Sequence, residues 1–536
     1  MIRPAQPIKL AFFARLLLPA TIALLSGAAS AQAPKVGDYY KDSTELGFRI
    51  RTPKDWEFTP PNPDEVNLIG KYEDRHLKSI QLGSDWDSTL WLHVWLVQFD
   101  TREKEEAPET EKEGVKVVRI GRGAENIDEW LEQNVDRSLR KVEEDTTKVD
   151  KCTAVELQYE GEVGGEPFRV YAMVYELEPG RSVAIVGNGP GEAKKWRKYE
   201  TSFKRMAKSF SRIEVSRAID LPALGSGSLR AQKRAKLQAD VARAPGWELY
   251  ESDNYFIVTD NDDKAFIKEL IDRLEAIRKT YEELYPPSLA DEIRDEAARE
   301  RARKIANGEA EDDDKPDPGE RRTTARKADP MEQSRCSVVR VCSDQGMYHS
   351  YGGPGGSAGY WASFHEELVI YDDKAGGGRR DTWNTLNHEA FHQYIFYFFG
   401  NLAPHSWYNE GHGDFFSGYQ LKNNRFTLKK NDWRESTIKE AIREGSFVPL
   451  DKIVRYTQGD YYSNAGLCYA QGWSMVYFLR TGKQNGAPNW QDSWDGILDT
   501  YLRVLATTND LDAAVDEAFK DVDWKAMTES WKAYIG

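Results

Sequence analysis

The sequence has few cysteines and no long apolar run beyond residue 31. Its four cysteines are Cys152, Cys336, Cys342 and Cys468. Four cysteines allow three disulfide pairings, and the sequence does not choose among them. Cys336 and Cys342 could close a small loop, but their spacing does not match a zinc knuckle. Because no later stretch approaches the roughly 18 apolar residues of a transmembrane helix, we expect a mature chain that does not span a membrane.

The sequence also has fewer basic than acidic residues. The 88 Asp and Glu residues exceed the 73 Lys and Arg residues, which gives a formal net charge of -15. This balance argues against nucleic acid or an anionic membrane as the main partner. The hydrophobic fraction of 40% and the 16 tryptophans suffice for real cores, and the length predicts about two to four domains.

The N-terminus has the pattern of a secretory signal. Basic residues precede an apolar stretch from Leu16 to Ala29, which at about 14 residues is too short to span a bilayer comfortably. Ala29, Ser30 and Ala31 then form an A-x-A cleavage site. We therefore expect residues 1–31 to be a signal peptide, cleaved after Ala31, and the protein to be periplasmic or extracellular; an uncleaved anchor is the alternative.

Residues 36–214 are predicted to form an α/β domain. Alternating residues at Gly47–Arg51 and an aromatic-rich run at Trp91–Phe99 indicate strands, and apolar residues at helical spacing indicate a helix over Trp196–Phe210. This order, with the segment GFRIRTPKDWEF, resembles PsbP-like domains. The resemblance implies a scaffold or binding domain, with a protein or ligand partner that the sequence does not identify.

The second half is predicted to be an α+β catalytic domain over residues 246–536, joined by a linker at 215–245. Strands near residues 255, 338 and 369 should form a small mixed sheet over a helix, and a mostly helical subdomain should follow from about Phe415. We find no internal repeat.

Residues 290–334 form a charged insertion with almost no large apolar side chains. This composition predicts a solvated helix that continues into a disordered loop. A segment that binds a partner protein is the alternative.

The helix predicted over Thr382–Phe399 contains the motif HEAFH, from His388 to His392. Two histidines four residues apart lie on one helical face and can chelate one Zn²⁺. Glu389 can then reach a metal-bound water without binding the metal. Two histidines at chance spacing on a surface helix are the alternative.

A second motif, WYNEGHGD from Trp407 to Asp414, follows after about 17 residues. Catalytic zinc sites need a third protein ligand and an open fourth position, and Glu410 can supply that ligand from a second helix. Asp414 lies one turn later on the same face, where it can accept a hydrogen bond from the outer nitrogen of a ligating histidine. The two motifs together predict a zinc site.

HExxH followed by W-x-N-E-G and an acidic residue four positions later resembles the gluzincins, the superfamily of thermolysin and aminopeptidase N. The segments NYFIVTD, ELVIYDD and YAQGWSMVYFL resemble, more narrowly, an uncharacterised bacterial gluzincin-like family over about residues 247–536. The resemblance implies a zincin fold and a metallopeptidase, with one Zn²⁺ per chain held by His388, His392 and Glu410, Glu389 as general base and Asp414 as outer partner. It also implies that the strand at Leu368–Tyr371 is the edge strand that pairs with an extended peptide.

The chain departs from the aminopeptidases around the third ligand. Gly411 and Gly413 flank His412, where those enzymes usually have an apolar residue, and no convincing exopeptidase motif is present. His412 and His405 lie near the site in sequence, but we expect them to be packed or solvated.

Gluzincins often stabilise the developing oxyanion with a Tyr or His beyond the third ligand. The resemblance implies Tyr469 for this role, with Tyr461 and Tyr462 as alternatives. The expected activity is hydrolysis of a peptide or protein substrate. Two other functions stay open: a catalytically silent binding protein with the same fold, and a zinc hydrolase of a non-peptide bond.

Overall fold

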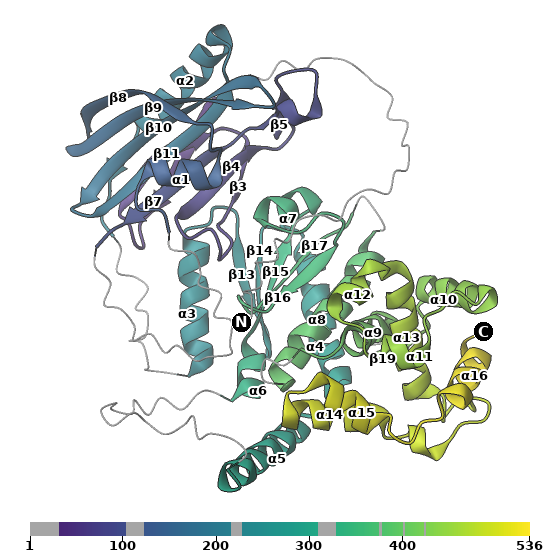
Figure 1. Cartoon of the computed structure of the whole chain (residues 1–536). Coiled ribbons are helices and arrows are strands. Elements are labelled where there is room, and N and C mark those ends of the chain that lie inside the picture. Colours follow the sequence, from purple (N-terminus) through teal and green to yellow (C-terminus); the bar gives the residue numbers. More distant parts are fainter. Residues whose placement is uncertain are drawn as a thin grey trace.

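The structure is a computed structural model. It describes residues 32–102, 123–215, 228–308, 329–374, 378–399, 403–422 and 425–536. The predicted signal peptide, residues 1–31, lies outside these ranges. The described part is a mixed α/β structure with an N-terminal β-rich half and a second half in which helices predominate (Figure 1).

The N-terminal half is built on a seven-stranded antiparallel sheet with the order β3-β4-β7-β11-β10-β9-β8. Its strands are β3 (Trp56–Thr59), β4 (Leu68–Asp74), β7 (Val94–Asp100), β8 (Arg140–Val149), β9 (Cys152–Val163), β10 (Glu166–Glu178) and β11 (Arg181–Pro190). Helix α2 (Ala193–Ala207) buries Trp196, Tyr199 and Phe203, which is the face that its helical spacing predicts.

Smaller elements surround this sheet. They are the sheet β1 (Val36–Asp42), β2 (Phe48–Pro53) and β12 (Ser211–Arg212), the hairpin β5 (Ser79–Gln81) and β6 (Thr89–Trp91) with the 3₁₀ turn η1 (Trp86–Ser88), and helix α1 (Ile127–Asn134).

The second half contains a five-stranded sheet with the order β13-β14-β15-β17-β16. Its strands are β13 (Glu248–Glu251), β14 (Tyr255–Thr259), β15 (Ser337–Cys342), β16 (Gly359–Ala362) and β17 (Glu367–Tyr371). The three central strands are parallel and the two outer ones antiparallel. The expectation for Leu368–Tyr371 is therefore wrong: this segment is β17, and β16 pairs with its outer side to become the edge strand.

Both faces of this second sheet are covered. On one face, Ile257, Val339 and Leu368 pack against α4 (Lys264–Leu284) and α8 (Arg379–Phe399). On the other face, Val338 and Val369 belong to the same apolar cluster as the core of the N-terminal half. Successive side chains of a strand point to opposite faces, so the continuous apolar runs of these strands follow from burial on both sides.

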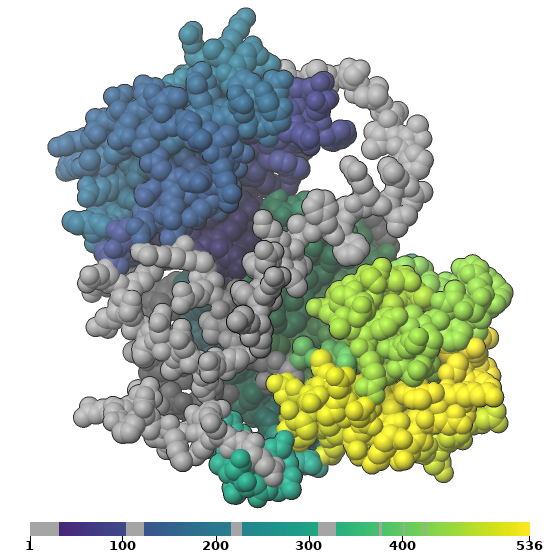
Figure 2. All heavy atoms as spheres, viewed as in Figure 1, coloured from purple at the N-terminus to yellow at the C-terminus, as the bar shows by residue number. Residues whose placement is uncertain are grey.

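Helices complete the second half. They are α3 (Leu229–Ala242), α5 (Pro287–Ala306), α6 (Pro330–Gln333), α7 (Gln345–Tyr351), α9 (Ser406–Ser417), α10 (Asp432–Glu444), α11 (Leu450–Ile453), α12 (Gln458–Ser463), α13 (Ala465–Thr481), α14 (Ile497–Thr508), α15 (Leu511–Ala518) and α16 (Trp524–Ile535), with the turns η2 (Ser334–Cys336) and η3 (Asp492–Trp494) and the hairpin β18 (Tyr419–Lys422) and β19 (Arg425–Leu428). Figure 2 shows the N-terminal half and the C-terminal helices as two lobes.

Two segments differ in part from the sequence predictions. The linker predicted at 215–245 contains α3, capped by the side chain of Ser228 at its first turn. The charged insertion predicted at 290–334 begins within α5, which is helical to Ala306 as expected. The loop predicted to be disordered falls mainly on 309–328, outside the described residues.

None of the four cysteines forms a disulfide in this structure. Cys336 and Cys342 stand at opposite ends of the extended strand β15. Six residues of strand span roughly 20 Å, whereas bridged Cα atoms lie within about 7 Å. The small loop that their spacing allowed is therefore excluded. Among the described helices, none combines the length and the apolar character needed to cross a bilayer.

Glu73 on β4 stands where the N-terminal half contacts α7. Its Oε1 lies 2.7 Å from Nε2 of His93, its Oε2 lies 3.1 Å from Nζ of Lys78, and it accepts a hydrogen bond from the hydroxyl of Ser350 on α7. Burial by itself raises the pKa of Glu73, but the hydrogen bond and charge of His93 outweigh it and lower that pKa to about 2. The carboxylate is thus stabilised in its charged form.

We predict that Glu73→Gln removes acid-sensitive stability. Because the folded pKa of about 2 lies below the ordinary value of 4.5, the stabilisation is complete above pH ~4.5 and is lost as the pH falls towards 2. At pH 7 the unfolding free energy of the variant should be lower than that of the wild type by on the order of 2 kcal/mol. When the pH falls from 5 to 2, the unfolding free energy of the variant should decrease less than that of the wild type. Urea unfolding followed by tryptophan fluorescence measures this.

The matched control is Glu57→Gln, which removes a carboxylate paired with the exposed Arg75. It should change the unfolding free energy by less than about 1 kcal/mol. If the unfolding free energies of the wild type and Glu73→Gln changed equally between pH 5 and 2, the lowered pKa of Glu73 would not be a source of stability.

Candidate metal centre

Helix α8 carries the first motif of the site. His388 and His392 lie one turn apart with ring centroids separated by 4.7 Å. The helix is buried on most sides, with Phe391 and Tyr394 packed against Tyr281 of α4. This packing fixes the position of α8 and holds the two histidines on the same face of the helix.

Helix α9 crosses α8 closely enough to bring Glu410 to the histidines. The approach depends on two glycines. A Cβ at Gly413 would lie 2.7 Å from Cε1 of His388, and a Cβ at Gly411 would lie 2.7 Å from the carbonyl oxygen of Gly472 on α13. Gly411 and Gly413 therefore let α9 fit between its two neighbours.

The three predicted ligands converge. Oε2 of Glu410 lies 3.1 Å from Nε2 of His388 and 3.4 Å from Nε2 of His392. Possible ligand atoms of all three residues lie within 4.8 Å of one another. Zn²⁺ bonds to such atoms are about 2.0–2.2 Å long, so tetrahedral ligands stand roughly 3.4 Å apart. The two separations that involve Glu410 are near this value, and the three side chains together could hold a metal ion.

The charges of the cluster are coupled. Burial by itself lowers the pKa of His388, but the hydrogen bonds that its ring donates to Asp414 and Glu410 outweigh burial and raise that pKa well above its ordinary value. Burial likewise opposes ionisation of Glu410, yet His392 and His388 hold the pKa of that carboxyl well below its usual range. The buried carboxylates therefore demand a positive charge among them, which a metal ion can supply in place of a proton.

Each ligand has an outer partner. Asp414 Oδ1 lies 3.3 Å from Nδ1 of His388, as the spacing predicts. Asn409 Oδ1 lies 3.1 Å from Nδ1 of His392, and the hydroxyl of Tyr462 donates to Oε1 of Glu410 at 2.9 Å. Such partners orient metal ligands and fix the histidine tautomers. Asn409 was not predicted from the sequence, although it stands next to Glu410 in the second motif.

Arg434 on α10 is a further residue that the sequence did not indicate. Its Nε lies 2.7 Å from Oδ2 of Asp414, and its guanidinium carbon lies 4.9 Å from the ring centroid of Tyr469. It thus holds the carboxylate that orients His388 and supports the face of Tyr469. No motif marks Arg434, because α10 reaches the site only through tertiary packing.

A pocket of about 820 Å³ opens beside the cluster. His388, Glu389, Asp414 and Tyr469 are among the residues that line it. The ring of Tyr469 lies nearly parallel to that of His388, with centroids 6.4 Å apart. Residues 356–359 and 430–434 line other parts of the pocket. The pocket brings Glu389 and Tyr469 to the same space as one of the ligands.

The two alternative tyrosines have other surroundings. The hydroxyl of Tyr462 is occupied by Glu410. Tyr461 is fully buried, and its hydroxyl would lie 2.3 Å from a Cβ at Gly472. Neither is among the residues that line the pocket.

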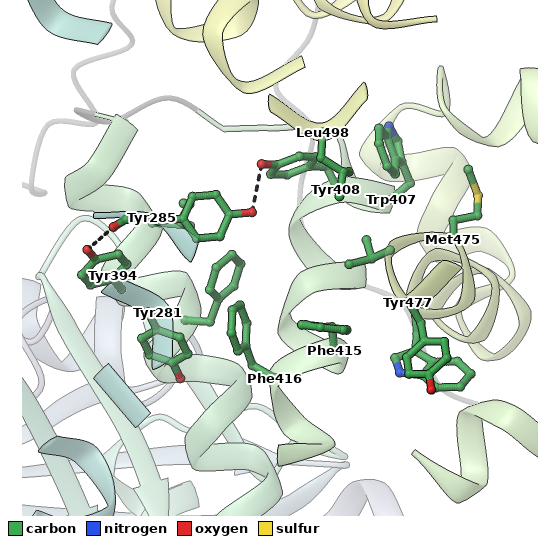
Figure 3. Close-up of a cluster of buried hydrophobic side chains, with 14 of the residues drawn as sticks. Tyr281, Tyr285, Tyr394, Trp407, Tyr408, Phe415, Phe416, Met475, Tyr477 and Leu498 are labelled. Atoms are coloured by element: carbon green, nitrogen blue, oxygen red, sulfur yellow. Dashed lines mark hydrogen bonds between the residues drawn. The ribbon is translucent and has the colours of Figure 1, made fainter. Parts of the chain in front are cut away.

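The histidines near the third ligand pack inside the protein. Nδ1 of His412 donates to the carbonyl of Tyr408 at 2.7 Å, so its Nε2 accepts from Arg480 at 3.1 Å. Burial and the charge of Arg480 lower the pKa of His412 well below its ordinary value, which keeps the ring neutral. His405 lies 2.9 Å from the hydroxyl of Tyr501. Figure 3 shows the aromatic core behind α9, including the 3.0 Å hydrogen bond between the hydroxyls of Tyr285 and Tyr408.

Comparisons with known proteins give little. No protein family and no curated protein matches the chain. A PsbP protein from Synechocystis sp. PCC 6803 is 13% identical and covers 35% of this chain and 98% of its own, with a TM-score of 0.23. Two further structures are similarly distant. The Ran-binding protein Mog1p of Saccharomyces cerevisiae is 11% identical and covers 34% of this chain and 97% of its own, with a TM-score of 0.21. PA94 of Pseudomonas aeruginosa, a protein of unknown function, is 10% identical and covers 33% of this chain and 95% of its own, with a TM-score of 0.17.

At these scores the likeness carries no conclusion about this chain. The gluzincin resemblance receives no support from any of the comparisons. A zinc peptidase is therefore a proposal that rests on the residues and their geometry.

We predict that Asn409→Ala weakens metal binding. Without the amide oxygen, the ring of His392 loses the partner that sets its tautomer and direction, so affinity for Zn²⁺ should fall by about 10- to 100-fold. Titration against a competing chelator measures the affinity. Asn485→Ala, which removes an exposed asparagine that contacts Tyr534, is the control and should leave it unchanged. Equal affinities for the two variants would show that Asn409 does not support the site.

Proposed function

We propose that the protein is an exported zinc-dependent peptidase, with His388, His392 and Glu410 as zinc ligands. The observation that carries the proposal is the convergence of these three side chains, with ligand atoms within 4.8 Å of one another, beside a pocket that Glu389 lines. Two histidines and a carboxylate form a donor set that catalytic zinc sites use. The N-terminal sequence supports export.

The metal and the protein would divide the chemistry. When bound, zinc lowers the pKa of a coordinated water towards about 7 and polarises the carbonyl of the substrate. The protein must then move protons and stabilise negative charge. Both tasks fall to residues that line the pocket.

The proposal gives the proton transfer to Glu389. This residue follows His388 on α8, lines the same pocket, and lies close enough for its charge to act on the ring of His388. We assign it the role of general base: it takes the proton from the attacking water and delivers it to the leaving amine. The half-buried position of Glu389 keeps the carboxylate accessible to that water.

Tyr469 is placed to stabilise the oxyanion. Its ring lines the pocket, parallel to His388 and supported by Arg434. Burial and the nearby charge of Glu410 raise the pKa of Tyr469 well above its ordinary value, so its hydroxyl stays protonated and can donate. A donor aimed at developing charge is worth about 10²–10³ in rate.

We predict that Glu389→Gln keeps the metal and loses hydrolysis. The amide preserves the shape of the side chain but cannot accept the proton, so kcat should fall by about 10²–10⁴ while metal content is unchanged. Elemental analysis together with cleavage of a peptide library measures both. The control Glu440→Gln changes an exposed residue that pairs with Arg443 and should retain full activity.

Full activity in Glu389→Gln would refute the mechanism. A metal-loaded wild type that cleaves no peptide would refute the peptidase. Cleavage of non-peptide esters or amides would then support a zinc hydrolase of a non-peptide bond. If these compounds were not cleaved either, a binding protein would be supported.

We predict that Tyr469→Phe and Tyr462→Phe have different effects. The first removes the proposed oxyanion donor, so kcat should fall by about 10²-fold with metal content unchanged. The second removes the hydrogen bond to Glu410, so metal affinity should fall, whereas kcat of the metal-loaded enzyme should change little. Steady-state kinetics at saturating zinc, with a metal titration, separates the two. The reverse pattern would assign the donor to Tyr462.

A further inference from the structure

One wall of the pocket is a glycine-rich segment with little side chain of its own. Residues 352–365 connect α7 to β17, and within them Gly356, Ser357, Ala358 and Gly359 line the pocket. Gly352 and Gly356 have φ angles of 116° and 80°, which other residues adopt only with strain. Such a segment loses much conformational entropy when it is ordered, so external contacts must hold it.

The first contacts come from α7. The backbone N–H of Gly353 donates to the carbonyl of Tyr348 at 2.8 Å, and Nδ1 of His349 lies 3.0 Å from the carbonyl of Gly353. The hydroxyl of Tyr348 reaches Oγ of Ser357 at 3.3 Å. The wall therefore follows the position of α7.

The N-terminal half in turn holds α7. Nζ of Lys78 donates to the carbonyl of Gly346 at 3.3 Å and to Oγ of Ser350 at 3.0 Å. The amide of Asn62 donates to the carbonyl of Tyr351 at 3.0 Å, which satisfies one of the free carbonyls at the end of the helix. Because a Cβ at position 352 would lie 3.0 Å from that amide, the close approach also favours glycine there.

The far end of residues 352–365 contacts the loop between β3 and β4, the loop that also contains Asn62. Nε2 of His365 lies 3.2 Å from Oδ1 of Asp64. Between the two ties runs β16, the edge strand, which among the described residues pairs with β17 alone. Asn62 and Asp64, in the loop between β3 and β4, thus contact Tyr351 just before residues 352–365 and His365 at their other end. Figure 1 shows this side of the N-terminal half directly above α7 and β17.

We propose that the N-terminal half is part of the catalytic unit, and that Asn62 and Asp64 are positioning residues that set the wall and edge strand against which the substrate binds. The proposal rests on the peptidase function proposed above. An extended peptide can add to a free strand edge, and its affinity then depends on how that edge is held. The two residues act on substrate binding through the wall, without touching the metal or the proton path.

The contacts of Asn62 and Asp64 are too weak to be needed for holding the halves together. Asp64 is 78% exposed, and exposed ion pairs contribute little. The halves share a continuous apolar cluster that includes Val338 and Val369 beneath the N-terminal sheet. Removing the two polar side chains should therefore leave the chain folded and its halves docked, so that any kinetic effect reports on the wall.

The test is the double variant Asn62→Ala/Asp64→Ala in the full chain. We expect KM for peptide substrates to rise roughly fivefold, which at 1.4 kcal/mol per tenfold is about 1 kcal/mol. The value of kcat at saturation and the zinc content should stay unchanged. Hydrogen exchange of the backbone should become faster in residues 352–365 and stay the same in α8 and α9. Asp64→Asn, which keeps an acceptor for His365, should stay near the wild type.

The control is Arg102→Gln, which breaks an exposed ion pair with Asp100 in the N-terminal half away from α7. An unchanged KM and unchanged exchange in the double variant would overturn the proposal. So would loss of zinc or faster exchange throughout the second half, because the residues would then be only structural. If the wild type cleaves no peptide, the peptidase fails, and the exchange experiment alone decides whether Asn62 and Asp64 hold the wall.

Discussion

The close crossing of α9 between α8 and α13 is the constraint on which the site depends. Gly413 lets α9 approach His388, and Gly411 lets it approach the backbone of α13 at Gly472. A Cβ at either position would lie 2.7 Å from a neighbouring atom, which is closer than real contacts allow, so α9 or its neighbour would have to shift. The crossing therefore places Glu410 over the two histidines and, through α13, places Tyr469 at the pocket.

The ligands themselves could be predicted because their geometry is local. Two histidines at i and i+4, and two acids at i and i+4, share a face on any helix, so His388, His392, Glu410 and Asp414 needed only the assumption of helicity. Periodicity and alternation also predicted β2, β7 and α2 in the first half and β14, β15 and β17 in the second. In the second sheet, however, the short strand β16 has no pattern of its own, and its pairing outside β17 could not be read from the sequence.

The contacts that could not be predicted from the sequence are those that depend on tertiary packing. Arg434 reaches Asp414 from α10, and Tyr462 reaches Glu410 from α12. Their positions depend on how the C-terminal helices fold back, which no single segment encodes. Helix α3 was hidden for another reason: with few large apolar residues, it reads as a connector until its packing against β13 and η2 is seen.

The charges around the site argue against a merely structural role. Glu410 and Asp414 are nearly inaccessible to solvent, with 7% and 3% exposure, and Arg434 is 12% exposed at its side chain. Burying such groups costs several kcal/mol per ion, and well-packed apolar residues of similar volume are often as stable or more so. A fold that needed only stability could do without them. Their convergence on two histidines, beside a pocket that Glu389 lines, is what the proposed metal site and its general base would require.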